Sequence, residues 1–598
     1  MEWNAQYDVI VLGFGGAGAT AARFAADGGA KVLLVDAAPY GHEGGNTRYA
    51  HQDVATGTDL TELTTYYQHM YQPYHVADAV LNAYLTGMVN MHDYFKKYLG
   101  VQAVSWKHDI KPGDPVPVVK ELAEYPELPG HETFDYSLVH HRHQDAGLWK
   151  ILRQKVVDRA DKIDVWLDSR AKHLYFNQER TAIQGVQITR QNKVYNVVAK
   201  RGVVLATGGY ENNPEMIQTF LQKPKLTPLG TLYNRGDGIR MAQEVGAKLW
   251  HMGVYEAFGD LAGLTFSTKP HQRGRQAIDW PLLNHGSIFV IADDGTRFFN
   301  EAQPSRHGRT FQHGHWTMPL HNDHPYLIFD QTQYQKFEQQ LKADGRLPYP
   351  EFMDKIIQGT SLTQLAEKIQ VPAENLQNTV NEFSEFTRKQ HDYTAGRDTA
   401  TMRVFDQGPY YAVKLANDVL NTQGGPQRDE QCRVLNLAGQ AIGHLFSAGE
   451  LGGICANRYQ GGGNLAECLI SGKIAGESAA KATETMPQNR VITTVGAIND
   501  LITDEASHFS VGPHQYLGSS NEGIGGKVVV RVTYDHHEIQ EVEVLENHES
   551  EDVGIAAITQ IPKQVVQTNS TDIDVVSGAS ATSRALKHAI EQAISKAK

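Results

Sequence analysis

The sequence predicts an α/β protein with a second, inserted α+β region and a small α+β module at its C-terminal end. A strand, a glycine-rich turn, a helix and a second strand follow one another over residues 7–36. The alternation of strands and glycines is lost over residues 241–405 and returns near His444. Residues 513–598 have a different pattern, in which a strand hairpin precedes a final amphipathic helix.

Length and composition place the chain among ordinary folded proteins. With 598 residues it is too long for one hydrophobic core, so about two to four domains are expected. Its 41% hydrophobic residues, 21% charged residues and mean hydropathy of −0.42 exclude a disordered or fibrous chain. The net charge of −13 argues against nucleic-acid binding, which needs a basic face for the phosphates.

The cysteines and histidines give no sign of a metal centre. Cys432, Cys455 and Cys468 are too few for a disulfide framework and form no CxxC pattern. HHRH at 140–143 has no carboxylate partner at a helical spacing, so we expect no metal site. The sequence shows no export signal and no run of about 18 apolar residues, which predicts a cytoplasmic protein without a membrane partner.

Residues 7–36 have every part of a dinucleotide-binding unit. The apolar run at 7–12 predicts a buried parallel strand, and Asp36 ends the second strand, where it can bind a ribose hydroxyl. The turn between them contains Gly13, Gly15, Gly16, Ala17 and Gly18. In such a turn the first glycine reverses the chain, the second admits a pyrophosphate and the third lets the helix pack on the strand. An ordinary glycine turn is the alternative, but both strands and the acid are in register with the motif.

The later segments predict how the domains are divided. A buried strand at 201–207 is closed by Gly208 and Gly209, and Gly236–Gly238 opens a helix. The predicted divisions are a discontinuous domain at 1–240 and 406–481, an insertion at 241–405, a linker at 482–512 and a C-terminal domain at 513–598.

Six motifs resemble the flavoprotein subunits of the fumarate reductase/3-ketosteroid dehydrogenase superfamily. They are GGNTRYA at 44–50, LATGGYENNPEM at 205–216, RGDGIRMAQEVGAKL at 235–249, GTRFFNE at 295–301, LFSAGELGG at 445–453 and ANRYQGGGNLAECLISGKIAG at 456–476. The resemblance implies an FAD-binding Rossmann-like domain, which holds FAD non-covalently, and an inserted α+β capping (substrate) domain. It implies further FAD contacts at Gly45, Asn46, Thr47, Thr207, Gly208, Asp237, Gly449, Glu450, Gly463, Asn464 and Leu465.

The C-terminal module resembles the small FMN-binding domain of sodium-pumping quinone reductase subunits. Strands at 527–534 and 539–545 predict a hairpin, and Ser577–Thr582 (SGASAT) matches that domain's S/T-G-A-x-x-T signature. The resemblance implies that Thr582 carries FMN through a phosphoester made by a flavin transferase, with Ser577 beginning the motif. Alternatively, Thr582 or Ser583 only caps the final helix.

The loop after RFFNE contains three candidate proton donors, Arg306, His307 and Arg309. In the reductases that the chain resembles, an arginine of this loop protonates one alkene carbon and hydride adds to the other. Arg306 lies one residue beyond the usual spacing, and histidine is the simpler acid near neutral pH, so all three remain candidates. A solvated basic loop is the alternative.

The substrate segments depart from the fumarate reductase pattern. Arg458, followed by Tyr459, matches the family arginine that holds a substrate carboxylate. Residues 421–425 (NTQGG) and 250–258 (WHMGVYEAF) lack two histidines of the family pattern, and each lost charge-assisted hydrogen bond costs about 1.5–3 kcal/mol. Fumarate is therefore disfavoured. The aromatic residues that suit a flat conjugated substrate are Trp250, Tyr255, Phe258, Tyr410, Tyr411 and Tyr459.

The resemblance and its departures together predict a flavin-dependent ene-reductase for a vinylphenol or hydroxycinnamate. Covalent FMN would relay electrons to FAD, from NADH directly or from a partner flavin reductase. The alternatives are a fumarate- or urocanate-type reductase of a carboxylated alkene, a ketosteroid-type FAD dehydrogenase and a non-catalytic electron-transfer flavoprotein.

Overall fold

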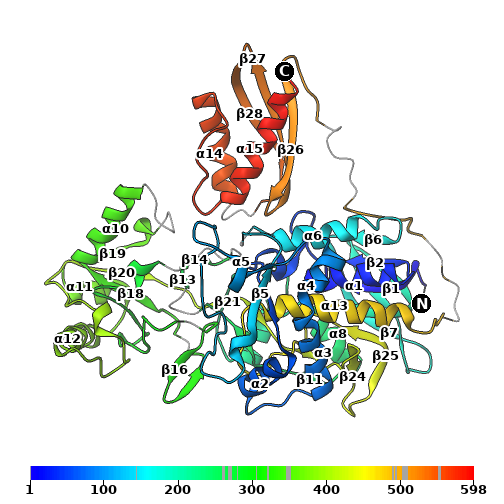
Figure 1. The fold of residues 1–598 in the computed structure, drawn as a ribbon, viewed down its shortest axis with the longest axis horizontal. Coiled ribbons are helices and arrows are strands. Elements are labelled where there is room, and N and C mark those ends of the chain that lie inside the picture. Colours follow the sequence, from blue (N-terminus) through cyan, green and yellow to red (C-terminus); the bar gives the residue numbers. More distant parts are fainter. Residues whose placement is uncertain are drawn as a thin grey trace. The chain divides into compact units, whose positions relative to one another are not determined.

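The chain folds into two compact units. Figure 1 shows the whole chain as a ribbon. The computed structural model describes residues 2–142, 145–258, 263–266, 273–278, 280–304, 306–319, 322–344, 352–487, 491, 494–501, 509–549 and 554–597. The first unit comprises residues 1–216, 230–255 and 421–598, and the second comprises 217–229 and 256–420.

A mostly parallel sheet forms the centre of the first unit. Its strands lie in the order β24 (Arg433–Leu435), β25 (Ala441–Ser447), β9 (Lys193–Leu205), β1 (Ala5–Leu12), β2 (Val32–Val35) and β6 (Ile163–Trp166). β1 pairs in parallel with β2 on one side and β9 on the other, so the strands predicted at 7–12, 31–35 and 201–207 are confirmed. The apolar run of β1 is buried because both of its edges are paired and helices cover the sheet.

Two helices far apart in the sequence pack closely beside this sheet, α1 (Gly16–Asp27) and α13 (Gly463–Lys481). Glycines make the close approach possible. A Cβ atom on Gly472 would lie 2.7 Å from the carbonyl oxygen of Ala17, and one on Gly476 would lie 2.4 Å from that of Ala21. The contact holds the segment before α13 near the glycine-rich turn before α1, in blue and yellow in Figure 1.

Further elements complete the first unit around the parallel sheet. β7 (Ser169–Phe176) and β8 (Ile183–Arg190) extend it through antiparallel pairing with β9. α8 (Asp237–Glu244) is the helix predicted to open at Gly236–Gly238. The remaining larger elements are β3 (Val54–Gly57), α2 (Leu60–Tyr71), α3 (Asp78–Val89), β4 (Val104–Ser105), β5 (Phe134–Leu138) and α6 (Gly147–Val157).

The predicted linker is anchored to the first unit along part of its length. The amide of Val165 in β6 donates to the carbonyl of Ile498 at 3.1 Å, and the amide of Asp500 donates back to Val165 at 3.0 Å. Arg190 adds an ion pair to Asp500, with Nη1 and Oδ2 2.6 Å apart. Residues 498–500 therefore continue the sheet beyond β6.

The C-terminal module is a three-stranded antiparallel sheet covered by two helices, in orange and red in Figure 1. Its elements are β26 (Gln515–Gly523), β27 (Gly526–Asp535), β28 (Glu538–Asn547), α14 (Gly554–Thr568) and α15 (Ser580–Ser595). The predicted hairpin is confirmed by the pairing of β27 with β28. Val528, Val530 and Val532 lie on one face of β27 and pack with the two helices in a core of their own.

The second unit is built on another antiparallel sheet. Its order is β15 (Ile288–Ile291), β18 (Tyr326–Asp330), β20 (Tyr410–Lys414) and β19 (Ile357–Gly359), with helices α10 (Gln331–Asp344), α11 (Leu362–Ile369) and α12 (Ala373–Lys389). Successive residues of a strand point to opposite faces, and each face has its own core. Tyr411 belongs to one core and Tyr410 to the other. Packing on both sides of β20 thus gives each of these tyrosines a structural role in a core.

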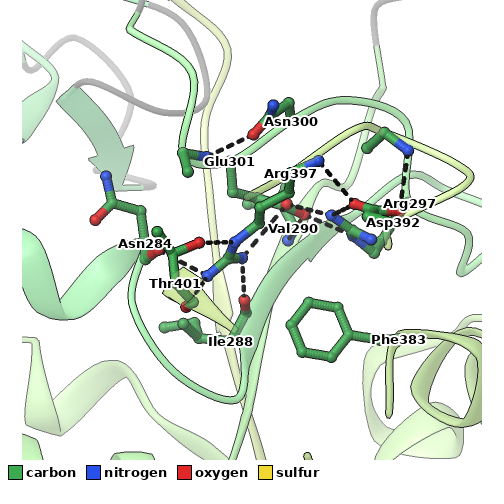
Figure 2. Close-up of polar contacts among 12 residues, drawn as sticks. Asn284, Ile288, Val290, Arg297, Asn300, Glu301, Phe383, Asp392, Arg397 and Thr401 are labelled. Carbon is green, nitrogen blue, oxygen red and sulfur yellow. Dashed lines mark hydrogen bonds and ion pairs between the residues drawn. The ribbon is translucent and has the colours of Figure 1, made fainter. Parts of the chain in front are cut away.

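A network of buried charges fixes the RFFNE segment in this unit (Figure 2). Arg297 lies 2.6 Å from Glu301 and 3.1 Å from Asp392, measured from Nη2 to the carboxylate oxygens. Arg397 contacts Glu301 at 3.4 Å and donates to the carbonyl of Ile288 at 2.8 Å. Buried charges are tolerated when they are paired and hydrogen-bonded in this way. The network therefore ties the chain just before the predicted proton-donor loop to β15.

No helix within the described ranges is both long and apolar enough to cross a membrane.

Candidate functional site

A cleft opens in the first unit where the parallel strands end. The ends of β1, β2 and β9 supply residues 12–17, 35–38 and 206–208 of its lining. In open α/β sheets, ligands bind outside the carboxyl ends of the strands. Predicted cofactor residues in the lining are Gly13, Gly15, Gly16, Ala17, Asp36, Gly45, Asn46, Thr47, Thr207, Gly208, Asp237, Gly449 and Glu450.

The glycine-rich turn has the geometry expected of a pyrophosphate site. Gly13 has a φ of +102°, and a Cβ there would lie 2.2 Å from the carbonyl oxygen of Ala206. Gly18 lies outside the lining, and a Cβ on it would meet the carbonyl of Gly13 at 1.8 Å, so it serves helix packing. A Cβ on Gly15 would have ordinary contacts, the nearest to the carbonyl of Gly44 at 3.5 Å. The space over Gly15 is therefore left for a ligand.

Helix α1 begins directly beneath this space. Its first residue, Gly16, donates its amide to Thr47 Oγ1 at 3.2 Å, which brings the 45–47 segment against the turn. The unpaired amides and the dipole of a helix N-terminus attract phosphate. The turn, the helix and the GGNT segment therefore form a cradle that fits the diphosphate of a dinucleotide.

Asp36 forms the part of the cleft where a ribose is expected. Its carboxylate accepts the amide of Phe14 and, at 2.7 Å, that of Ala38, which fixes the side chain. Burial raises the pKa of Asp36 to about 6, so the group is still ionised above that pH. An ionised carboxylate in this position accepts hydrogen bonds from ribose hydroxyls.

Two glutamates share the same amide donors at one side of the cleft. Asn46 Nδ2 lies 2.7 Å from Glu211 Oε1 and 2.8 Å from Glu450 Oε1. Asn234 Nδ2 contacts the same two oxygens at 3.1 and 3.3 Å. Burial raises the pKa of Glu211. Glu211 and Asn234 are not among the predicted site residues, although Glu211 closely follows a buried strand and a glycine pair, a signal that could have identified it.

No sequence motif indicated that the other lining residues belong to the cleft. Arg170 on β7 forms an ion pair with Asp237, which anchors the start of α8 in the cleft wall. β7 joins the sheet through antiparallel strands, and no motif marks it. The other unpredicted lining residues include Thr231, Tyr233 and Cys468.

The start of α13 lies beside the cleft lining and not within it. Asn464 donates its amide to the Tyr459 hydroxyl at 3.0 Å and accepts from Gln423 Nε2 at 3.0 Å. The carbonyl of Gly463 accepts from the Tyr84 hydroxyl at 3.0 Å. Leu465 is buried in the same helix. The structure thus gives Gly463, Asn464 and Leu465 protein partners and leaves them outside the lining.

Arg458, the predicted carboxylate-binding residue, lies over an aromatic ring. Its guanidinium carbon is 5.5 Å from the centre of the Tyr125 ring. Its Nε is buried and has no hydrogen-bond partner among the residues that the structure describes. Arg458 is therefore charged and partly desolvated, as a residue that binds an anion would be.

His251 lies in the segment where the sequence departs from the fumarate reductase pattern. Its ring stacks on Trp250, with ring centres 4.3 Å apart, and its Nδ1 lies 2.7 Å from the carbonyl of Gly453. Burial lowers the pKa of His251, which favours the neutral ring. With Nδ1 donating to Gly453, Nε2 carries the lone pair and can accept a proton.

The three predicted proton donors lie in one tight turn of the second unit. Arg306 and Arg309 pair through their backbones, and His307 and Gly308 between them have φ values of +48° and +85°. The Arg306 guanidinium lies over Trp316 of β17 (His315–Thr317), which pairs with β16 (Thr310–Gln312). Arg309 is buried, with Nη2 4.0 Å from Oε1 of the fully buried Glu256. His307 stacks on Phe258 at 6.0 Å.

The SGASAT motif leads into the first turn of α15. Thr582 is 2% exposed, and its hydroxyl donates to Glu549 Oε2 at 2.6 Å. Ser583 Oγ accepts the amide of Val576 at 3.0 Å, so Ser583 and not Thr582 ties down the preceding turn. Gly578, next to Ser577, has a φ of +76° and no heavy atom of the described residues within 4 Å of an added Cβ. This open turn beside a helix N-terminus has room for a phosphate group.

Models of known protein families match both the region that contains the cleft and the C-terminal module. A family model described as an FAD binding domain matches residues 8–465. The chain belongs to this FAD-binding family. A second model, described as an FMN-binding domain, matches residues 523–595 of the flavoprotein.

Curated relatives of the flavoprotein are oxidoreductases. It is 26% identical over 476 residues to a probable fumarate reductase of Shewanella frigidimarina, covering 79% of this chain and 74% of the relative. It is 25% identical over 523 residues to the vinyl phenol reductase of Lactiplantibacillus plantarum, covering 80% and 97%. The flavoprotein is thus a flavin-dependent oxidoreductase of the FAD-binding family whose model matches residues 8–465.

A solved structure shows the same fold. The 3-ketosteroid Δ1-dehydrogenase from Sterolibacterium denitrificans superimposes with a TM-score of 0.61 at 20% identity, covering 80% of the flavoprotein and 100% of that chain. The predicted α/β flavoprotein fold with a small C-terminal FMN-binding domain is therefore confirmed.

Proposed function

We propose that the flavoprotein is an ene-reductase for a conjugated, aromatic alkene of the vinylphenol or hydroxycinnamate type. The observation that carries the proposal is the neutral chemistry of the substrate segments. Gln423 is uncharged, and the pKa of His251 is lowered by burial, so neither supplies the positive charge that a dicarboxylate needs. Similarity to a vinyl phenol reductase over 97% of its length supports the same substrate class.

FAD would occupy the cleft of the first unit, with its diphosphate on the turn at Gly13–Gly18 and a ribose on Asp36. When reduced, it supplies the hydride. FMN would be joined to Thr582 through a phosphoester, which requires a flavin transferase as maturation partner. We also propose that the protein is cytoplasmic, which cell fractionation tests. Its electrons would come from NADH directly or from a partner flavin reductase, which assays with each donor test.

The protein's own residues would move two protons. Arg309, buried beside Glu256, donates one to the alkene carbon that does not receive hydride, and Glu256 holds the guanidinium in place. For a vinylphenol, Nε2 of neutral His251 accepts the phenol proton while Arg309 protonates the terminal carbon, which gives a quinone methide. The quinone methide takes hydride at its benzylic carbon, and the proton on His251 returns to the phenol oxygen. Glu301 and Arg397 hold the chain before the Arg306–Arg309 turn.

A carboxylated alkene is the second candidate substrate, favoured by one observation. Nε of Arg458 is buried and has no partner among the described residues, so a substrate carboxylate would satisfy it. A hydroxycinnamate would use both Arg458 and His251, whereas a vinylphenol would use His251 alone.

The test is an alkene panel with the enzyme expressed beside a flavin transferase and then chemically reduced. Fumarate, urocanate, cinnamates and vinylphenols are mixed separately with it, and flavin reoxidation is followed by absorbance. The proposal expects the fastest reoxidation with vinylphenols or hydroxycinnamates. Fastest reoxidation by fumarate would support the carboxylated-alkene reductase instead, and reoxidation by none of them would support a carrier without alkene chemistry. Arg458→Gln is the matched variant, expected to slow only carboxylated substrates.

A further inference from the structure

The Thr582 hydroxyl makes one short hydrogen bond inside the C-terminal module. Thr582 Oγ1 lies 2.6 Å from Oε2 of Glu549. The two residues are 2% and 7% exposed, so water competes little for either group. The first turn of α15 therefore presents a hydroxyl whose proton already points at a carboxylate.

Glu549 is held in this position by a backbone amide and by close packing against two glycines. Its second oxygen, Oε1, accepts the amide of Gly525 at 2.9 Å. A Cβ on Gly523 would lie 1.9 Å from Oε1, and a Cβ on Gly554 would lie 2.4 Å from the Glu549 Cβ. Side chains at either glycine would displace the carboxylate, so the surrounding chain leaves a fitted space for it. Such a fixed, buried acceptor is more than helix capping requires.

We propose that Glu549 is the general base that activates Thr582 for attachment of FMN. The inference rests on the attachment site proposed above, and is independent of the alkene that the enzyme reduces. A hydroxyl is a weak nucleophile unless a neighbouring base removes its proton. Glu549 Oε2 is within the reach that such a transfer needs.

The reaction requires a flavin donor with a phosphoanhydride, and FAD is such a donor. Thr582 Oγ1 attacks the phosphorus on the riboflavin side of the pyrophosphate. The new Oγ1–phosphorus bond forms as the phosphorus–oxygen bond to the second phosphate breaks, and AMP leaves. The Thr582 proton passes to Glu549 Oε2, and no electrons are gained or lost. The N-terminus of α15 lies next to the reacting phosphate and stabilises its charge.

The protonated carboxyl group that results suits the product. A charged Glu549 would repel a phosphodiester attached 2.6 Å away, whereas a neutral carboxyl can donate a hydrogen bond to it. Removal of the proton from Oγ1 and stabilisation of the product would therefore use the same side chain.

The test follows covalent flavin incorporation by intact mass. Full-length unmodified protein is incubated with the flavin transferase and FAD, and the rate of mass gain is measured. Glu549→Gln keeps a carbonyl for the Gly525 amide but cannot take the proton, so its rate should fall by about 10²–10⁴-fold. Glu546→Gln on β28, whose carboxylate pairs with His548, is the matched control and should react at the wild-type rate. The wild-type rate should fall at low pH, and the Glu549→Gln rate should lose that dependence.

The outcomes separate the two proposals. Thr582→Ala should gain no mass, and a mass gain by this variant would mean that the attachment site is wrong. Loss of modification in Thr582→Ala together with a wild-type rate in Glu549→Gln would overturn the role of Glu549 alone. If Glu549→Gln melts below the assay temperature, Glu549→Asp decides. A slowed rate with the wild-type pH dependence supports the base, because the shorter side chain withdraws it from Oγ1, and an unchanged rate contradicts it.

Discussion

Arg306 lies over the indole ring of Trp316, with its guanidinium carbon 3.7 Å from the ring centre, whereas Arg309 is buried beside Glu256. The aromatic face of Trp316 stabilises the Arg306 cation. A carboxyl group 4.0 Å away, once it has taken up a proton, can pass it directly or through water to an arginine that has given one up. We therefore propose Arg309 as the proton donor, with Glu256 beside it as a relay.

Arg309→Gln is expected to slow alkene reduction by about 10²–10⁴-fold, the usual contribution of a general acid. FAD content and the rate of flavin reduction should stay near wild type, because neither step protonates carbon. Stopped-flow reoxidation of the reduced enzyme by the alkene measures the effect.

Arg306→Gln and His307→Asn are the controls for Arg309→Gln. Asparagine is chosen because His307 has a φ of +48°, which asparagine tolerates. If Arg306→Gln causes the larger selective loss, Arg306 is the donor and its stacking on Trp316 positions it. Wild-type rates in all three variants would remove this turn from the mechanism.

Gly15→Val is expected to abolish FAD binding without unfolding the protein. A Cβ at Gly15 meets no described protein atom closer than 3.5 Å, so the side chain occupies only the space left for the pyrophosphate. Released flavin after denaturation, counted separately from covalent flavin, measures the effect. Gly18→Ala is the contrasting variant, because its Cβ would lie 1.8 Å from the Gly13 carbonyl, and it should lower the melting temperature itself. Full FAD content in Gly15→Val would show that the cofactor binds elsewhere.

Arg397→Gln is expected to destabilise the second unit by about 3–5 kcal/mol, as loss of one partner from a buried ion pair does. The variant would leave Glu301 with one cation fewer and remove a hydrogen bond to the carbonyl of Ile288. Denaturant unfolding measures the change. Arg388→Gln, at an exposed position of α12, should stay within about 0.5 kcal/mol of wild type. Equal stability of the two variants would contradict a structural role for the network in Figure 2.

The raised pKa of Glu211 makes stability depend on pH. Because burial raises this pKa in the folded state, the folded protein binds more protons than the unfolded chain. The stabilisation is complete at low pH and is lost as pH rises through the raised pKa. Glu211→Gln should therefore gain stability relative to wild type as pH rises, measured as melting temperature in a pH series. Exposed Glu215→Gln is the control, and a parallel pH profile for Glu211→Gln and wild type would contradict the shift.

Local motifs predicted the dinucleotide cradle, and tertiary packing explains what they missed. Gly13 and Asp36 belong to one continuous strand–turn–helix–strand unit, so their spacing alone identifies their positions. Arg170 and Asn234 reach the cleft only because antiparallel strands and a loop return to it. No motif near Arg170 or Asn234 in the sequence indicates that these residues reach the cleft.

For the aromatic residues, residue type alone does not predict a role in the site. The chemistry of Tyr410 and Tyr411 suits a flat substrate, but adjacent residues of a strand point to opposite faces. Helices bury both faces of β20, so each tyrosine belongs to a core. The family resemblance did supply the C-terminal motif. The partner of Thr582, Glu549, is separated from it by the whole of α14 and belongs to no recognised motif.

The anchoring of residues 498–500 to β6 shortens the tether of the C-terminal module. Fourteen residues separate Asp500 from the start of β26 at Gln515, and a chain of that length can span at most about 50 Å. A linker of this length gives the module a millimolar effective concentration relative to the rest of its own chain. Its encounters with the rest of the molecule are therefore intramolecular, and their rate should not change when the enzyme is diluted.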